Sequence, residues 1–143
     1  MSIREKWAVT LCYKQTEKLE DRIAVIIQYL DKIYPNDQWN ILDIDATGKM
    51  GNQLTQCINN EETLLLSSAE LLQILTEEGQ VIDLEISLIN QGQEIIKIFV
   101  EDGVSIDVLG VAILLPTEIF GEYKIVDSHQ FLWQETSRDP IYN

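Results

Sequence analysis

The 143-residue chain has few of the residues on which catalytic sites are built. It has one histidine, His129, whose surroundings show no spacing that specifies a nucleophile, and its two cysteines, Cys12 and Cys57, form no CxxC pair. Both cysteines fall within apolar patterns, which indicates buried free thiols. None of the seven glycines falls in a phosphate-binding or dinucleotide-binding pattern. We therefore expect no enzymatic activity, no catalytic residue, no metal and no cofactor.

Basic residues are also scarce. The chain has 10 Lys and Arg against 24 Asp and Glu, and the formal net charge is −14. The imbalance is uneven, because residues 50–143 hold only 3 basic residues against 16 acidic ones. Such a chain repels phosphate backbones and anionic lipid surfaces. The charge therefore argues against nucleic acid and membranes as direct partners.

Long apolar runs and linker-like segments are missing too. The longest apolar run, Val108–Leu115, is far too short to span a bilayer as a helix. The first residues, Met1–Trp7, are not followed by the apolar stretch of a secretory signal, so we expect a cytoplasmic protein. The length and the absence of a low-complexity tract predict one domain over residues 1–143.

The first half of the chain predicts a strand followed by an amphipathic helix. The segment Trp7–Tyr13 is rich in β-forming residues. Thr16 is the expected cap of a helix over Glu17–Ile33, whose apolar residues recur at i, i+3 and i+4 and which Pro35 ends. The segment Trp39–Ile44 fits either a short strand or an ordered loop.

Two further helices are predicted before residue 80. Apolar residues at Leu54, Cys57 and Ile58 allow a short helix after the glycines at 48 and 51. Ser67 and Glu70 have the spacing of a capping box, and Gly79 stands where a C-terminal cap is expected.

From Val81 the apolar period changes from 3.6 to 2, which predicts antiparallel strands joined by turns at 90–93 and 101–103. The third strand, Ser105–Leu115, is apolar enough to be central and covered on both faces, and Pro116 ends it. The tail from Tyr123 to Trp133 fits a strand or a helix. The expected fold class is α+β, with amphipathic helices packed on one face of an antiparallel sheet. In the strand that begins at Val81, the residues expected to point inward are Ile82, Leu84, Ile86 and Leu88.

Some acidic patterns are compatible with chemistry, although a simpler explanation exists for each. Asp43 and Asp45 share one strand face, as do Asp83 and Glu85, but solvated strand faces give the same spacing. Asp107 followed by Glu122-Tyr123-Lys124 resembles the acidic motif of metal-dependent nucleases, yet so acidic a chain would repel a nucleic-acid substrate.

Protein recognition is the better use for the acidic residues. Negative charge at the end of a helix opposes the macrodipole, so the two glutamates before Gly79 are locally unfavourable. The other candidates lie on polar strand faces or at strand ends, and two tryptophans in polar surroundings could support them. The candidate contact residues are Glu77, Glu78, Asp83, Glu85, Glu101, Asp102, Asp107, Trp39 and Trp133.

The order of these segments resembles a bacterial polymorphic-toxin immunity family, immunity protein 52. The similar features are the strand and amphipathic helix followed by Trp39, the leucine-rich helix Leu71–Gly79, the Asn-Gly turn after Ile86, Gly103, and a strand that ends at Pro116. The resemblance implies an α+β immunity protein that has no reaction of its own. Such a protein neutralises a cognate toxin, often a nuclease, of contact-dependent growth inhibition or type VI secretion systems.

The charge agrees with this implication, because an acidic inhibitor complements the basic substrate cleft of a nuclease and speeds association. The expected partner is a cognate protein toxin, bound by a monomer or weak dimer. The alternative is an acidic secretion chaperone that wraps an unfolded effector segment and usually dimerises.

Overall fold

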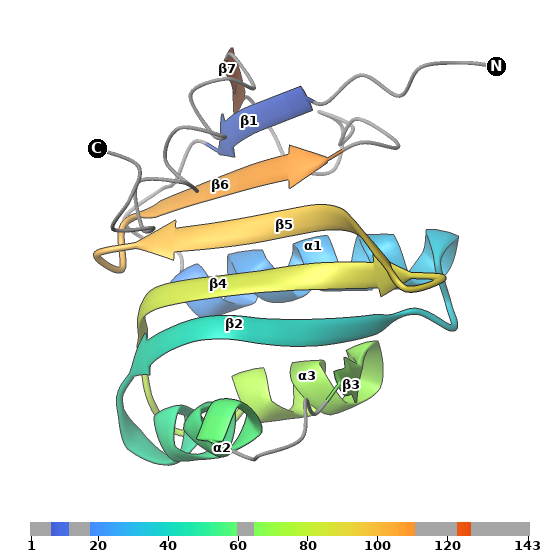
Figure 1. Cartoon of the computed structure of the whole chain (residues 1–143). Coiled ribbons are helices and arrows are strands. Elements are labelled where there is room, and N and C mark those ends of the chain that lie inside the picture. The colour runs from blue at the N-terminus through green and yellow to red at the C-terminus, as the bar shows by residue number, and fades with distance from the viewer. Residues whose placement is uncertain (1–6, 12–17, 60–64, 111–122, 127–143) are drawn as a thin grey trace, which may run out of the picture.

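The computed structural model describes residues 7–11, 18–59, 65–110 and 123–126, and it has the expected α+β architecture. Seven strands form one sheet in the order β3-β2-β4-β5-β6-β1-β7, and every neighbouring pair is antiparallel (Figure 1). The strands are β1 (Trp7–Leu11), β2 (Gln38–Ala46), β3 (Leu65–Ser67), β4 (Val81–Asn90), β5 (Gln93–Glu101), β6 (Ser105–Gly110) and β7 (Tyr123–Val126). The helices are α1 (Leu19–Ile33), α2 (Gly48–Asn59) and α3 (Ser68–Leu75).

Helix α1 crosses one face of the sheet behind β4 and β5 (Figure 1). Its apolar stripe is fully buried at Ile23, Ile26, Ile27 and Leu30, as the helical period predicts. The helix begins with Lys18 as its N-cap, which makes no side-chain capping bond. The expected cap, Thr16, lies outside the described residues, so the helix is anchored by its packed face and by the acidic residues of its first turn.

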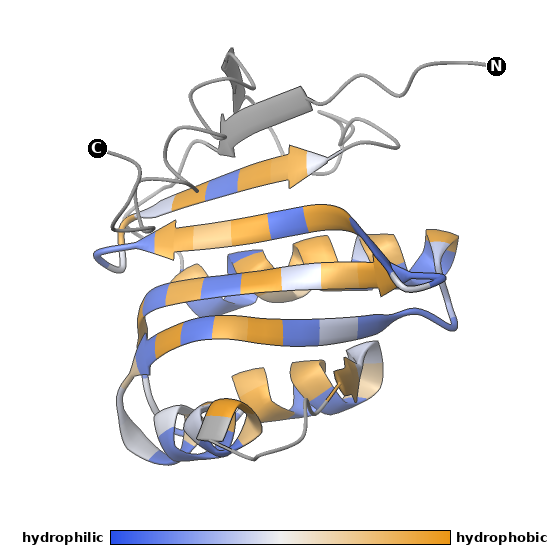
Figure 2. Ribbon diagram, in the orientation of Figure 1, coloured by the Kyte–Doolittle hydropathy of each residue, from blue (hydrophilic) through white to orange (hydrophobic). Residues whose placement is uncertain are grey.

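The three predicted antiparallel strands are β4, β5 and β6, joined by the predicted turns. Residues at the turn tips have positive φ, including Gly92 (80°) and Gly103 (65°), which tight hairpin turns require. Hydropathy alternates along β4 (Figure 2). Strand β6 pairs with β5 and β1 and is therefore central, although residues 111–116 of the expected strand lie outside the described residues.

The inward alternation of β4 holds at Leu84, Ile86 and Leu88, each at most 2% exposed, but not at Ile82. Ile82 is half-buried, whereas its neighbour Val81 is buried. The register between β2 and β4 shifts between the Asp45 and Ala46 pairs, so the two strands lose their regular alternation at this end. The expectation for Ile82 is therefore wrong for a local geometric reason.

The region before β4 is more regular than its sequence suggests. The segment around Trp39 is a full strand, β2, and the short helix expected near Leu54 is α2, which begins at Gly48 itself. The capping box of α3 is present, since the Glu70 amide donates to Ser67 Oγ and the Ser67 amide donates to Glu70 Oε1. The helix ends earlier than predicted, at a Thr76 cap.

Gly79 has a different role from the expected helix cap. Its φ is 143°, and a Cβ at this position would lie 2.0 Å from the Thr47 carbonyl oxygen. The glycine therefore allows the loop after α3 to pass directly against the segment that enters α2. This close approach brings α2, α3 and the start of β4 together at one end of the molecule.

Candidate functional site

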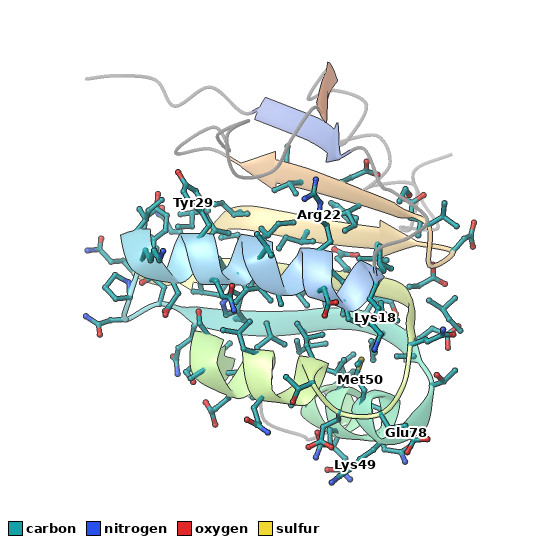
Figure 3. All side chains as sticks on the ribbon, turned by 180° about the vertical axis from the view of Figure 1, so that it is seen from behind. Lys18, Arg22, Tyr29, Lys49, Met50 and Glu78 are labelled. Carbon is teal, nitrogen blue, oxygen red and sulfur yellow. The ribbon has the colours of Figure 1, made fainter. Side chains whose placement is uncertain are left out.

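Backbone contacts draw many element ends together at one end of the molecule. The Val81 amide at the start of β4 donates to Glu20 Oε2 on α1 (2.8 Å), and the Met50 amide on α2 donates to the Glu78 carbonyl (2.9 Å). In Figure 3, Lys18, Met50, Lys49 and Glu78 lie at this same end, away from Tyr29. We call this region the acidic end, and define it by Glu20, Asp21, Asp45, Glu77, Glu78, Asp83, Glu101 and Asp102.

The sheet contributes a like-charge pair to the acidic end. Asp45 on β2 lies directly opposite Asp83 on β4, and Asp83 Oδ1 accepts a hydrogen bond from the Asp102 amide at 3.0 Å. Like charges directly opposite each other destabilise an antiparallel pair. A cation placed against Asp45 and Asp83 would relieve this repulsion, so the arrangement favours a positively charged partner.

The segment after α3 adds Glu77 and Glu78. Lys49 Nζ lies 3.3 Å from Glu77 Oε2, with 63% of the lysine side chain exposed, so solvent screens this ion pair. Glu78 is exposed and its carboxylate extends the acidic end beyond the sheet. Of the predicted contact residues, the structure therefore brings together Glu77, Glu78, Asp83, Glu101 and Asp102.

Three other predicted contact residues are not on the surface. Glu85 and Asp107 are only 7% and 8% exposed, and Trp39 is fully buried. Glu85 Oε2 lies 3.4 Å from Lys97 Nζ, and both side chains are at most 9% exposed. The expectation that these residues lie on an exposed surface is wrong, because both faces of the central strands are buried where these residues lie. Trp133 lies outside the described residues.

Trp39 is a core residue with a specific polar partner. Its indole Nε1 donates to Ser68 Oγ at 2.9 Å, which joins β2 to the first residue of α3. Ser68 is itself 3% exposed. A buried tryptophan needs an acceptor for its N–H group, and here the acceptor, Ser68, is 29 residues away in the sequence, so that only folding brings the two together.

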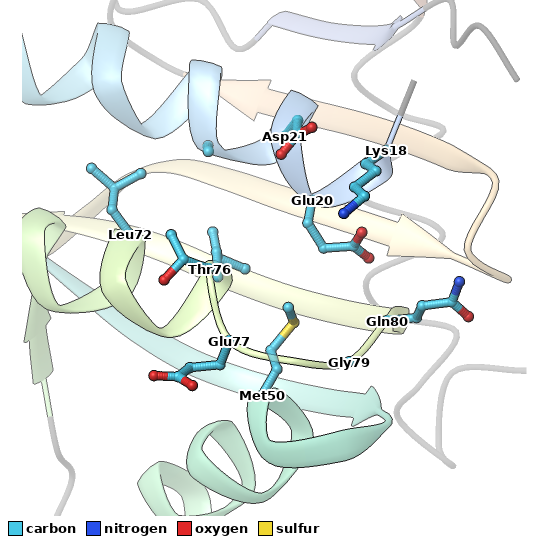
Figure 4. A pocket seen from close by; sticks show the side chains of 11 residues that line it. Lys18, Glu20, Asp21, Met50, Leu72, Thr76, Glu77, Gly79 and Gln80 are labelled. Carbon is cyan, nitrogen blue, oxygen red and sulfur yellow. The ribbon is translucent and has the colours of Figure 1, made fainter. Parts of the chain in front are cut away.

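A cavity of about 390 Å³ opens at the acidic end, between α1, α3 and the residues that follow α3. Figure 4 shows Lys18, Glu20 and Asp21 on one side of it and Met50 and Leu72 reaching toward it from others. Its lining is Lys18, Glu20, Asp21, Ala24, Met50, Leu72, Leu75, Thr76, Glu77, Gly79 and Gln80. Of these lining residues, only Glu77 belonged to the predicted site. The others come from elements that are far apart in the sequence, and no sequence pattern links them.

The described residues include no cluster of three or more His, Cys, Asp or Glu side chains that could hold a metal ion. Cys57 is a buried free thiol whose Sγ lies 3.5 Å from the Gln53 carbonyl oxygen. Burial, and secondarily the charge of Glu70, raises the pKa of the Cys57 thiol, which disfavours the reactive thiolate. Cys12 and His129 lie outside the described residues. None of the helices in the described ranges is long and apolar enough to span a membrane.

Comparison with family models, with curated proteins and with solved structures gave no match to this chain.

Proposed function

We propose that this protein is an immunity protein that binds a cognate secreted bacterial toxin and neutralises it by protein-protein contact. The observation that carries the proposal is the acidic end, where carboxylates from α1, β2, β4, the loop after α3 and the β5–β6 turn gather at one end of the molecule. The resemblance to a toxin-immunity family, drawn from the order of the sequence segments, supports the same proposal.

A toxin that acts on nucleic acid offers the complementary surface. Its substrate cleft is basic, and the carboxylates of the acidic end take the place of the phosphates that the cleft binds. Long-range attraction between the two surfaces raises the association rate by about 10–10³-fold. The immunity protein acts in the cytoplasm, where it meets a toxin that has been delivered into the cell.

The experiment is a protection assay in bacteria. A candidate toxic domain is sought in the reading frame beside the gene for this protein and is expressed from an inducible promoter, with and without the protein, while growth is followed. We expect growth arrest in its absence and near-normal growth in its presence. Growth arrest that the intact, soluble protein does not relieve would overturn the proposal.

A pair of charge variants locates the contact. Asp45→Asn, Asp83→Asn and Asp102→Asn together remove three charges from the acidic end while keeping the oxygen of Asp83 that accepts the Asp102 amide. The matched control removes three charges from the other end, through Asp31→Asn, Glu70→Gln and Glu94→Gln. Both have the same net charge, so loss of protection only in the first variant assigns the contact to the acidic end.

A further inference from the structure

The cavity at the acidic end combines an apolar base with a charged mouth. Met50 and Leu75 at its base are 1% and 6% exposed, and Ala24 and Leu72 are partly buried along its walls. Glu20 and Asp21 lie at its mouth, on the first turn of α1 (Figure 4). Apolar surface beneath carboxylates suits a ligand that has an aliphatic stem and a cationic head.

The carboxylates at the mouth retain capacity to bind. Glu20 uses Oε2 to accept the Val81 amide, which fixes the side chain and leaves Oε1 available. Asp21 is exposed and forms no hydrogen bond or ion pair with its side chain within the described part of the chain. Glu77 is already paired with Lys49. The vacant acceptors are therefore concentrated on the α1 side of the cavity.

The size of the cavity fits one long side chain with its hydration. Its volume of about 390 Å³ is at the small end of ligand pockets. A water molecule takes up about 30 Å³ of liquid, so the space corresponds to roughly a dozen waters. Arginine is the basic side chain best suited to such a place, because its guanidinium is weakly hydrated and carries several N–H donors for carboxylate oxygens.

We infer that this cavity receives an arginine side chain of the protein partner, with its stem against Met50 and Leu72 and its guanidinium at Glu20 and Asp21. The inference rests on the proposed function for the identity of the partner, but the ligand chemistry can be tested without it. Lys18 lies at the same mouth and forms no ion pair within the described residues, so its charge competes with the incoming cation.

The first experiment titrates the ¹⁵N-labelled protein with n-butylguanidinium and follows amide chemical shifts. The matched probes are guanidinium, which lacks the stem, and 1-butanol, which lacks the charge. We expect saturable shifts at residues 20–24 and 72–80 with n-butylguanidinium only. Shifts that do not saturate, or that the two partial probes reproduce, would overturn the inference while leaving the proposed function standing.

Two variants are expected to change the affinity for n-butylguanidinium in opposite directions. Asp21→Asn is expected to weaken n-butylguanidinium binding roughly two- to fivefold, and Lys18→Gln to strengthen it by a similar factor. Asp31→Asn, on the same helix but at its other end, is the control and leaves the affinity unchanged. Equal affinities for all these folded variants would contradict the placement of the guanidinium.

The partner is tested with Ala24→Phe, which fills the cavity from its half-buried wall. We expect this variant to lose probe binding and to bind the toxin domain at least about tenfold more weakly, with Lys18→Gln binding it as well as or better than the parent. Wild-type toxin affinity in a folded Ala24→Phe protein that no longer binds the probe would overturn the assignment to the partner. Failure of the parent protein to protect cells from the toxin would instead overturn the proposed function.

Discussion

At the scale of single residues, the sequence predicted which strands and turns carry polar and aromatic side chains better than it predicted which of these side chains are exposed. Asp102 is exposed and Asp83 is half-buried, and the structure joins them through a hydrogen bond. Glu85, Asp107 and Trp39 are buried. Alternation in one strand indicates that one face is apolar, but the burial of the second face depends on distant segments that a local pattern does not contain.

The role of Trp39 can be separated from recognition by Trp39→Phe. This change removes the indole N–H that donates to Ser68 Oγ and leaves a gap in the core. We expect a loss of about 1–3 kcal/mol in the free energy of unfolding, measured by urea denaturation. Toxin affinity of the folded variant is expected to stay unchanged. Unchanged stability combined with weaker binding would return Trp39 to the interface.

The buried ion pair between Lys97 and Glu85 gives a second prediction at this scale. Lys97→Met leaves the Glu85 carboxylate buried without its cation, and we expect it to cost about 3–5 kcal/mol of unfolding free energy. Adding Glu85→Gln removes the buried negative charge, so the double variant is expected to recover part of that loss. If the double variant loses as much unfolding free energy as the two single variants lose together, Lys97 and Glu85 are not coupled.

At the scale of elements, the start of α3 was predicted from two residues, because a capping box is a local interaction with a fixed spacing. The three-residue strand β3 was not predicted, since it exists only through pairing with β2. The cavity was not predicted either, because its lining comes from α1, α2 and α3 and depends on Gly79 allowing the loop to approach Thr47.

The capping box predicts a pH dependence. Hydrogen bonds from Ser67, first from its backbone amide, hold the pKa of the Glu70 carboxyl below its usual 4.5. A lowered folded-state pKa means that the stabilisation is complete above pH 4.5 and is lost as the pH falls through the folded-state value. Glu70→Gln keeps the accepting oxygen without the charge, so we expect its thermal midpoint to fall less between pH 5 and pH 3 than that of the parent, measured by circular dichroism. An identical decline in both proteins would contradict this role.

At the scale of the whole molecule, the sequence predicted the excess of negative charge but not its arrangement. Carboxylates of the acidic end come from positions between 20 and 102, and only the antiparallel sheet and the contacts of α1 and α2 bring them to one end of the molecule. This arrangement concentrates negative charge at the acidic end, so the electrostatic field of the protein is strongest there. It is the feature on which the proposed toxin neutralisation depends.

The most direct measurement is the association rate with the cognate toxin domain by stopped flow between 50 and 500 mM salt, over which the Debye length falls from about 14 Å to about 4 Å. We predict that the Asp45→Asn, Asp83→Asn, Asp102→Asn variant associates more slowly at low salt and depends less on salt than the parent. The variant with three charges removed at the other end is predicted to behave much more like the parent. Equal rates and salt slopes for the two variants would contradict a contact through the acidic end.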